Sequence, residues 1–202
     1  MAFPINADLL KRIISDGNHP AAPTGSQFIS TSVFMLVFNR QQLPCLLTVL
    51  KANNTGYPWR NQVALPGGHV DETDKSALAA AYRELEEEVH IPPDRIEFVG
   101  SLGHFQTVQQ KDIEVFLGLW RRLESDIQFD AKEISQVLTP SIPMLLTRHL
   151  NQNFNGRTPG IGELIYPVEN VVIWGVTARI VHYFLELVRT RLSAAELQAL
   201  IA

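Results

Sequence analysis

The hydrophobic residues of the chain follow two different periods, and these predict the order of its strands and helices. Short runs rich in β-branched and aromatic residues predict strands, whereas apolar residues three and four positions apart predict helices. The predicted strands cover residues 28–38, 44–50, 62–65, 96–106, 113–120, 163–166 and 170–174. The predicted helices cover residues 7–15, 73–89, 142–150 and 177–192, with a last short helix after Ser193.

The order of these elements predicts an α/β fold. Strands surround one long central helix, and further helices lie near both ends, which is typical of a sandwich with sheets between helices. No internal repeat or linker interrupts this order, so we expect a single domain over residues 1–202. Two polar stretches, residues 17–26 and 51–60, are predicted to be exposed loops.

Composition narrows the class of protein. Hydrophobic residues make up 46% of the chain, enough for a sizeable core. The net charge is −4 and no basic cluster is present, so a nucleic-acid partner is not expected. No apolar run approaches the roughly 18 residues of a membrane span, and we expect a cytoplasmic protein. Cys45 is the only cysteine, which excludes an internal disulfide and Cys-rich zinc sites.

The central helix is predicted to carry an acidic edge. At about 100° per residue, Glu84, Glu87 and Glu88 fall within one arc of roughly 100°. The adjoining arc is apolar and should face the core; it contains Leu78, Ala81, Leu85 and Val89. Like charges at this spacing repel, and a hard divalent cation such as Mg²⁺ or Mn²⁺ would offset the repulsion. A solvated acidic face is the alternative interpretation.

A glycine pair precedes this helix at a characteristic spacing. Gly68 is followed by five residues, then Asp74, then eight residues, then the run Arg-Glu-Leu-Glu-Glu-Glu that begins at Arg83. This combination resembles the Nudix box, over about residues 67–91. Three details depart from the general pattern: Asp74 replaces a Glu, the spacer is one residue longer, and His90 stands at a Gly position.

The resemblance implies a fold and a metal site. It implies an α/β/α sandwich with a mixed sheet and a catalytic loop–helix–loop. It also implies that Glu84, Glu87 and Glu88 ligate Mg²⁺ or Mn²⁺, helped by a backbone carbonyl near Gly67 or Gly68. The expected enzyme is a diphosphatase, in which water attacks a diphosphate phosphorus.

The resemblance implies further roles for individual side chains. Arg83 would orient a carboxylate through a bidentate contact rather than touch the substrate. The general base varies within the family. Glu87 is our first candidate, and the downstream acids Asp112 and Glu114 are alternatives.

A narrower resemblance concerns the substrate. The stretches around residues 46–48, 62–74, 79–88 and 174–178 are similar to those of coenzyme A pyrophosphohydrolases. Leu50 and Asn61 depart from that subfamily, which usually has Arg and Gly there. The expected reaction converts coenzyme A or an acyl-CoA to 3′,5′-ADP and 4′-phosphopantetheine or its acyl form. The alternatives are another nucleotide (ADP-ribose, a dinucleotide or a nucleotide sugar) and a non-catalytic Nudix-fold binding module.

Residues outside the box are expected to select the substrate. Lys51 and Arg60 are candidates to bind the 3′-phosphate of coenzyme A, because a phosphate calls for a basic partner. Trp59 is a candidate to stack on an adenine, and packing against its own domain is the alternative. The expected partner is a small nucleotide-like molecule, and a homodimer stays open.

Overall fold

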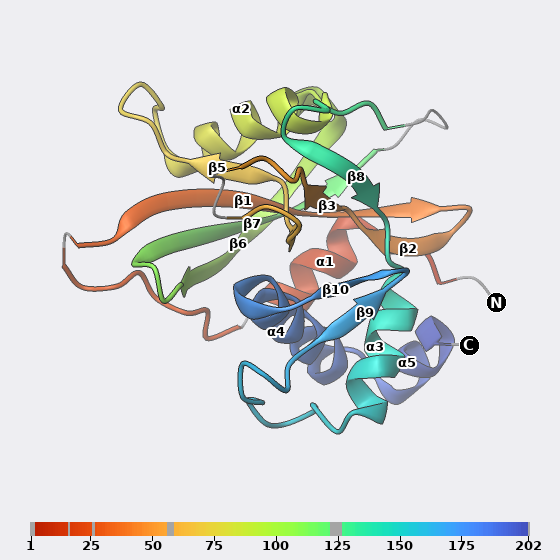
Figure 1. Cartoon of the computed structure of the whole chain (residues 1–202). Helices are drawn as coiled ribbons and strands as arrows, with labels where there is room; N and C mark the ends of the chain where they lie inside the picture. Colours follow the sequence, from red (N-terminus) through yellow and green to blue (C-terminus); the bar gives the residue numbers. More distant parts are fainter. Residues whose placement is uncertain (1–2, 16, 26, 56–58, 122–126, 202) are drawn as a thin grey trace.

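Residues 3–15, 17–25, 27–55, 59–121 and 127–201 are described by a computed structural model of the chain (Figure 1). Its helices are α1 (Ala7–Ile14), α2 (Ala77–Val89), α3 (Ile142–Asn151), α4 (Gly175–Arg191) and α5 (Ala194–Ile201), with a 3₁₀ turn, η1, at Pro93–Arg95. Its strands are β1 (Ile29–Arg40), β2 (Leu43–Leu46), β3 (Thr48–Lys51), β4 (Val63–Ala64), β5 (Gly67–His69), β6 (Ile96–Gln106), β7 (Lys111–Trp120), β8 (Ile134–Leu138), β9 (Tyr166–Val168) and β10 (Val171–Ile173).

The main sheet is mixed. Its strand order is β2-β1-β7-β6, with β5 also paired to β1. The β1–β7 pair is parallel, and the other pairs are antiparallel. A second sheet has the order β4-β3-β8, and β9 pairs with β10. No helix in the described ranges is long and apolar enough to cross a membrane.

Helices cover both faces of the main sheet, as Figure 1 shows with α2 above it and α1 and α4 below. Alternate residues of β1 point to opposite faces. Phe34 and Phe38 pack with Leu85 of α2 in one core cluster. Met35 packs in the other cluster, which includes Leu10 of α1. This confirms the predicted α/β sandwich with a mixed sheet.

One predicted strand proves to be two. Residues 44–50 were expected to form a single strand, but the strand breaks at Leu47. β2 pairs with β1 in the main sheet, whereas β3 pairs with β4 and β8 in the second sheet. The prediction that Lys51 begins an exposed loop is also wrong, because Lys51 ends β3 and is buried.

Other boundaries differ for local reasons. The box helix was expected from residue 73 but begins at Ala77, because the Ser76 hydroxyl caps it by accepting a hydrogen bond from the Ala79 amide at 3.1 Å. The strand expected at 163–166 lies at Tyr166–Val168 instead. β8 had no counterpart among the predicted elements. Asn6 caps α1 as predicted.

Candidate active site

The glycine pair forms β5, which lies against β1 at the start of the box. Gly67 has φ +145°, and a Cβ there would collide with the backbone of Ser32 and Val33. At Gly68, a Cβ would collide with the carboxylate of Glu84. Gly67 therefore requires glycine, for its positive φ and its close approach to β1, whereas a larger residue at Gly68 would displace the Glu84 carboxylate.

The three box carboxylates line one cavity of about 310 Å³, but their exposure differs widely. The side chain of Glu87 is 60% exposed, that of Glu84 is 17% exposed and that of Glu88 is 1% exposed. Glu86 is exposed on α2, in keeping with the helical periodicity, and Lys75, which precedes the helix, is exposed as well. The acidic edge thus runs from solvent into the protein interior.

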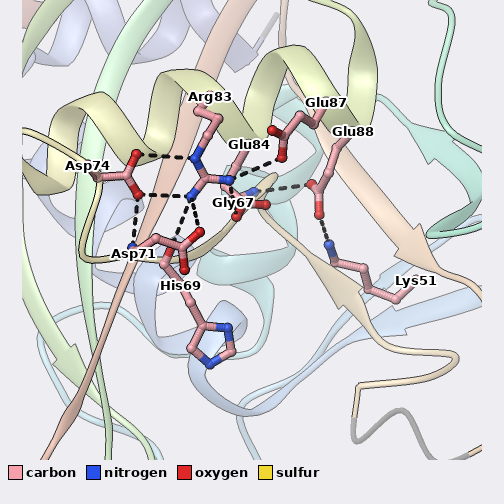
Figure 2. A network of polar contacts seen from close by, with 9 residues as sticks. All are labelled: Lys51, Gly67, His69, Asp71, Asp74, Arg83, Glu84, Glu87 and Glu88. Atoms are coloured by element: carbon pink, nitrogen blue, oxygen red, sulfur yellow. Dashed lines mark hydrogen bonds and ion pairs between the residues drawn. The ribbon is translucent and has the colours of Figure 1, made fainter.

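Glu88 forms a buried ion pair with Lys51 (Figure 2). The Lys51 ammonium donates to Glu88 Oε1, and the Gly67 amide donates to Glu88 Oε2 at 3.2 Å. Burial raises the pKa of Glu88, and the charge and hydrogen bonds of Lys51 and Gly67 oppose that rise. Lys51 therefore belongs to the cavity wall and faces a carboxylate.

Arg83 lies at the centre of a second network (Figure 2). Its Nε and Nη2 donate to the two oxygens of Asp74, at 3.2 and 2.9 Å. Its Nη1 donates to Glu84 at 2.9 Å and to Glu87 at 3.1 Å, and Nη2 also reaches the His69 carbonyl at 3.2 Å. Hydrogen bonds from Arg83 hold the pKa of Asp74 below its ordinary value. The Arg83 side chain thus links the loop that precedes α2 to α2 itself through hydrogen bonds.

The donor chemistry of this edge fits a hard divalent cation. Burial raises the pKa of Glu84, and the charge of Glu87 adds to the rise, so added positive charge would favour the ionised form. In the described part of the chain, no three acidic, His or Cys side chains meet around one point. Instead, Glu88 accepts a hydrogen bond from Lys51, and Glu84 and Glu87 accept hydrogen bonds from Arg83. The oxygen donors are nevertheless those that Mg²⁺ and Mn²⁺ prefer.

A different set of side chains forms another part of the cavity wall. Lys111, the first residue of β7, places its Nζ 2.7 Å from His69 Nε2 and 3.8 Å from the centre of the Trp59 ring. The Trp59 and His69 rings lie 6.0 Å apart. Trp59 was predicted from the sequence as a substrate-binding residue, whereas Lys111 and His69 were not. The one indication in the sequence for these two residues was the position of His69 directly after the glycine pair.

Several other candidates lie elsewhere. Arg60 is exposed and is absent from the described cavity lining. Asp112 accepts hydrogen bonds from His104 and Gln106, each at 2.8 Å, and does not line the cavity. Glu114 contacts Ser101 and does not line it either. Glu133, from a segment for which no element was predicted, does line it.

Comparison with known families assigns the chain to one of them. The NUDIX domain family model matches residues 29–156, a span that includes the glycine pair and all of α2. The chain belongs to the Nudix domain family. Among curated relatives, the uncharacterized Nudix hydrolase NudL of Escherichia coli strain K12 is 34% identical over 124 residues. That match covers 59% of this chain and 63% of NudL, less than two thirds of the relative's length.

Solved structures of other Nudix proteins share the fold. The MutT protein from Methanosarcina mazei Go1 aligns with a TM-score of 0.53 and 15% identity, covering 85% of this chain and 100% of that chain. The NUDIX domain of Shewanella oneidensis NrtR, solved with ADP ribose, aligns with a TM-score of 0.51 and 18% identity, covering 84% and 91%. At these identities the likeness concerns the fold.

Two departures from Nudix sequence patterns have the same structural explanation. His90, at the Gly position that ends the box helix, adopts φ 53° and ψ 35°. Asn61, at the Gly position of the subfamily resemblance, has φ 57°. Both residues keep the left-handed backbone that glycine favours, and Asn adopts it at a small cost. The His90 ring also lies 3.1 Å from the Glu86 carbonyl.

Proposed function

We propose that this Nudix protein hydrolyses the diphosphate linkage of a nucleoside diphosphate derivative with the help of Mg²⁺ or Mn²⁺. The observation that carries the proposal is that Glu84, Glu87 and Glu88 line one cavity together with Gly67 and Gly68. Family membership supports the reaction class, because Nudix hydrolases typically use divalent metal ions. A non-catalytic binding module is disfavoured because all three box carboxylates are present.

Each residue of the site has a proposed task. Glu84, Glu87 and Glu88 would hold the divalent cation, with the backbone carbonyl of Gly68. The bound cation would neutralise charge on the diphosphate oxygens and increase the acidity of the attacking water. Arg83 positions Glu84 and Glu87 through its hydrogen bonds to both and to Asp74. It is therefore a positioning residue.

The hydrolytic step needs a base. The oxygen of water bonds to one phosphorus, the bond from that phosphorus to the bridging oxygen breaks, and the base takes a proton from the water. We assign this task first to Glu87, the most exposed of the three carboxylates. Glu133 is the second candidate because it lines the same cavity, whereas Asp112 and Glu114 do not.

For the substrate, we propose coenzyme A or an acyl-CoA, cut to 3′,5′-ADP and 4′-phosphopantetheine or its acyl form. The subfamily-like stretches support this choice, and one of them supplies Val176 and Thr177 to the cavity wall. The alternative class is another nucleoside diphosphate derivative. ADP-ribose belongs to it, and the structurally similar NrtR domain was solved with that ligand.

A product analysis tests the proposal. The purified protein is incubated with coenzyme A, acetyl-CoA, ADP-ribose, a dinucleoside polyphosphate and a nucleotide sugar, each with Mg²⁺ or Mn²⁺, and products are identified by mass. We expect 3′,5′-ADP from coenzyme A and no reaction after chelation. Faster turnover of ADP-ribose than of any coenzyme A ester would overturn the substrate assignment. No turnover of any diphosphate would overturn the enzymatic one.

A further inference from the structure

Lys111 is a buried cation in the wall of the active-site cavity. The residue is only 7% exposed, and it lines the cavity together with His69 and Trp59. Its ammonium lies 2.7 Å from His69 Nε2 and 3.8 Å from the centre of the Trp59 ring. Three segments distant in sequence therefore meet at this ammonium. Trp59 comes from the loop that precedes β4, His69 from β5, and Lys111 itself from β7.

Lys111 lacks the carboxylate partner that Lys51 has. Within the described residues, no Asp or Glu oxygen lies within 4.0 Å of the Lys111 ammonium. Burial lowers the pKa of Lys111, and no acidic side chain contributes an opposing shift. A buried ammonium without an anion is energetically costly, so an anionic ligand at this point would stabilise the protein.

The two cations that the sequence predicted as phosphate ligands are poorly placed to bind one. Lys51 already contacts Glu88, and Arg60 lies outside the described cavity lining. The positive charge of Lys51 opposes the rise in the pKa of both Glu84 and Glu88. In Figure 2 the His69 ring points away from Glu87 and Glu88. Lys111 therefore serves a part of the cavity separate from the box carboxylates.

We propose that Lys111, held between His69 and Trp59, binds a phosphate group of the substrate that is not part of the scissile diphosphate. An ammonium has three N–H donors, and the hydrogen bond to His69 leaves two for phosphate oxygens. Within the proposed function, on which this inference rests, the group is the 3′-phosphate of coenzyme A. Lys111 is thus a specificity-determining residue.

Paired substrates that differ by one phosphate test this role. The ratio of kcat/KM for coenzyme A to that for 3′-dephospho-coenzyme A is measured for the wild type, Lys111→Met and Lys11→Met. Lys11 is the control because it lies on α1 in a surface ion pair with Glu97. We expect Lys111→Met to lower the ratio by about tenfold to a hundredfold, mainly through KM for coenzyme A. An unchanged ratio would overturn the proposal, even if both substrates slow equally.

A binding measurement separates this inference from the proposed function. Adenosine 3′,5′-bisphosphate and adenosine 5′-monophosphate are titrated into the wild-type protein by calorimetry, which requires no turnover. We expect tighter binding of the bisphosphate, with the difference lost in Lys111→Met and kept in Lys11→Met. Equal affinity of the wild type for both nucleotides would overturn the role of Lys111 even in an active diphosphatase. A difference that depends on Lys111 in an inactive protein would support the inference while the proposed function fails.

Discussion

The side chains of Lys51 and Glu88, 37 positions apart in the sequence, meet in the wall of the candidate active-site cavity. Lys51 ends β3 of the small sheet, and Glu88 lies in the last turn of α2. Their side chains are 5% and 1% exposed. The pair joins the second sheet to the box helix, so it couples the acidic edge of that helix to the stability of the protein.

Glu88→Gln is expected to lower both stability and activity. The change leaves the buried Lys51 charge facing a neutral amide, which costs about 3 kcal/mol. Repulsion among the three glutamates, taken alone, would predict the opposite result, a gain in stability on removal of one charge. Chemical denaturation measures the effect. The double variant Lys51→Met/Glu88→Gln should recover at least half of the lost stability, and additive losses would show that the pair is not coupled.

Glu84→Gln and Glu87→Gln are expected to separate activity from stability. Each should lower kcat by at least about a hundredfold, since each removes a proposed metal ligand. The midpoint of thermal unfolding should stay the same or rise slightly, because burial disfavours the charged form of Glu84 and repulsion between Glu84 and Glu87 adds to this effect. Glu86→Gln is the matched control, exposed on the same helix. Full activity in both Glu84→Gln and Glu87→Gln would refute the assignment of the site.

Arg83→Ala is expected to lower kcat by about tenfold to a hundredfold, because the carboxylates it holds lose their orientation. Arg83→Lys should recover little, since an ammonium cannot reproduce the paired contacts to Asp74. Arg148→Ala, on the exposed surface of α3, is the control. If kcat stays unchanged and only KM rises, Arg83 binds the substrate instead.

His90→Gly tests whether His90 is structural. Its left-handed backbone strains a side chain by about 1–2 kcal/mol, and loss of the contact to Glu86 and greater chain entropy offset part of that. We expect stability to rise by at most about 1 kcal/mol, with kcat unchanged. Steady-state kinetics and denaturation check this. Normal stability with lost catalysis would assign His90 a role in the reaction.

Glu186 is expected to make the protein acid-sensitive. Burial would raise its pKa, but hydrogen bonds from Arg189, Gly156 and His149 outweigh burial and lower the pKa to about 2. These bonds are 2.7–3.0 Å long. The folded-state pKa lies below the unfolded value of about 4.3. The stabilisation is therefore complete above about pH 5 and is lost as pH falls towards 2.

Glu186→Gln should remove this pH dependence. At pH 7 we expect the variant to lose about 1–2 kcal/mol, and the difference from the wild type should shrink as pH falls below about 4 and vanish near pH 2. Urea unfolding at several pH values measures it, with Glu86→Gln as the control that follows the wild type throughout. A constant difference from pH 7 to pH 2.5 would show that Glu186 does not account for the acid sensitivity.

Features that depend on near neighbours were predictable from the residues alone. The period of α2 placed Leu85 and Val89 in the core and Glu86 in solvent, as observed. The same holds for the paired strands β6 and β7 and for the cap at Asn6. Helical and strand periods are properties of consecutive residues, so they survive in any fold that buries the apolar face. The spacing from Gly68 to Arg83 likewise carried the family resemblance.

Features that depend on packing between distant segments needed the tertiary structure. No local pattern separates a strand that stays in one sheet from one that changes sheets at Leu47. Lys51 resembled a loop residue because its partner, Glu88, lies on another element. Lys111 resembled part of a polar turn, yet His69 and Trp59 hold it inside the cavity. Burial of a charge depends on which segments meet around it, and that is decided when the sheets and helices pack.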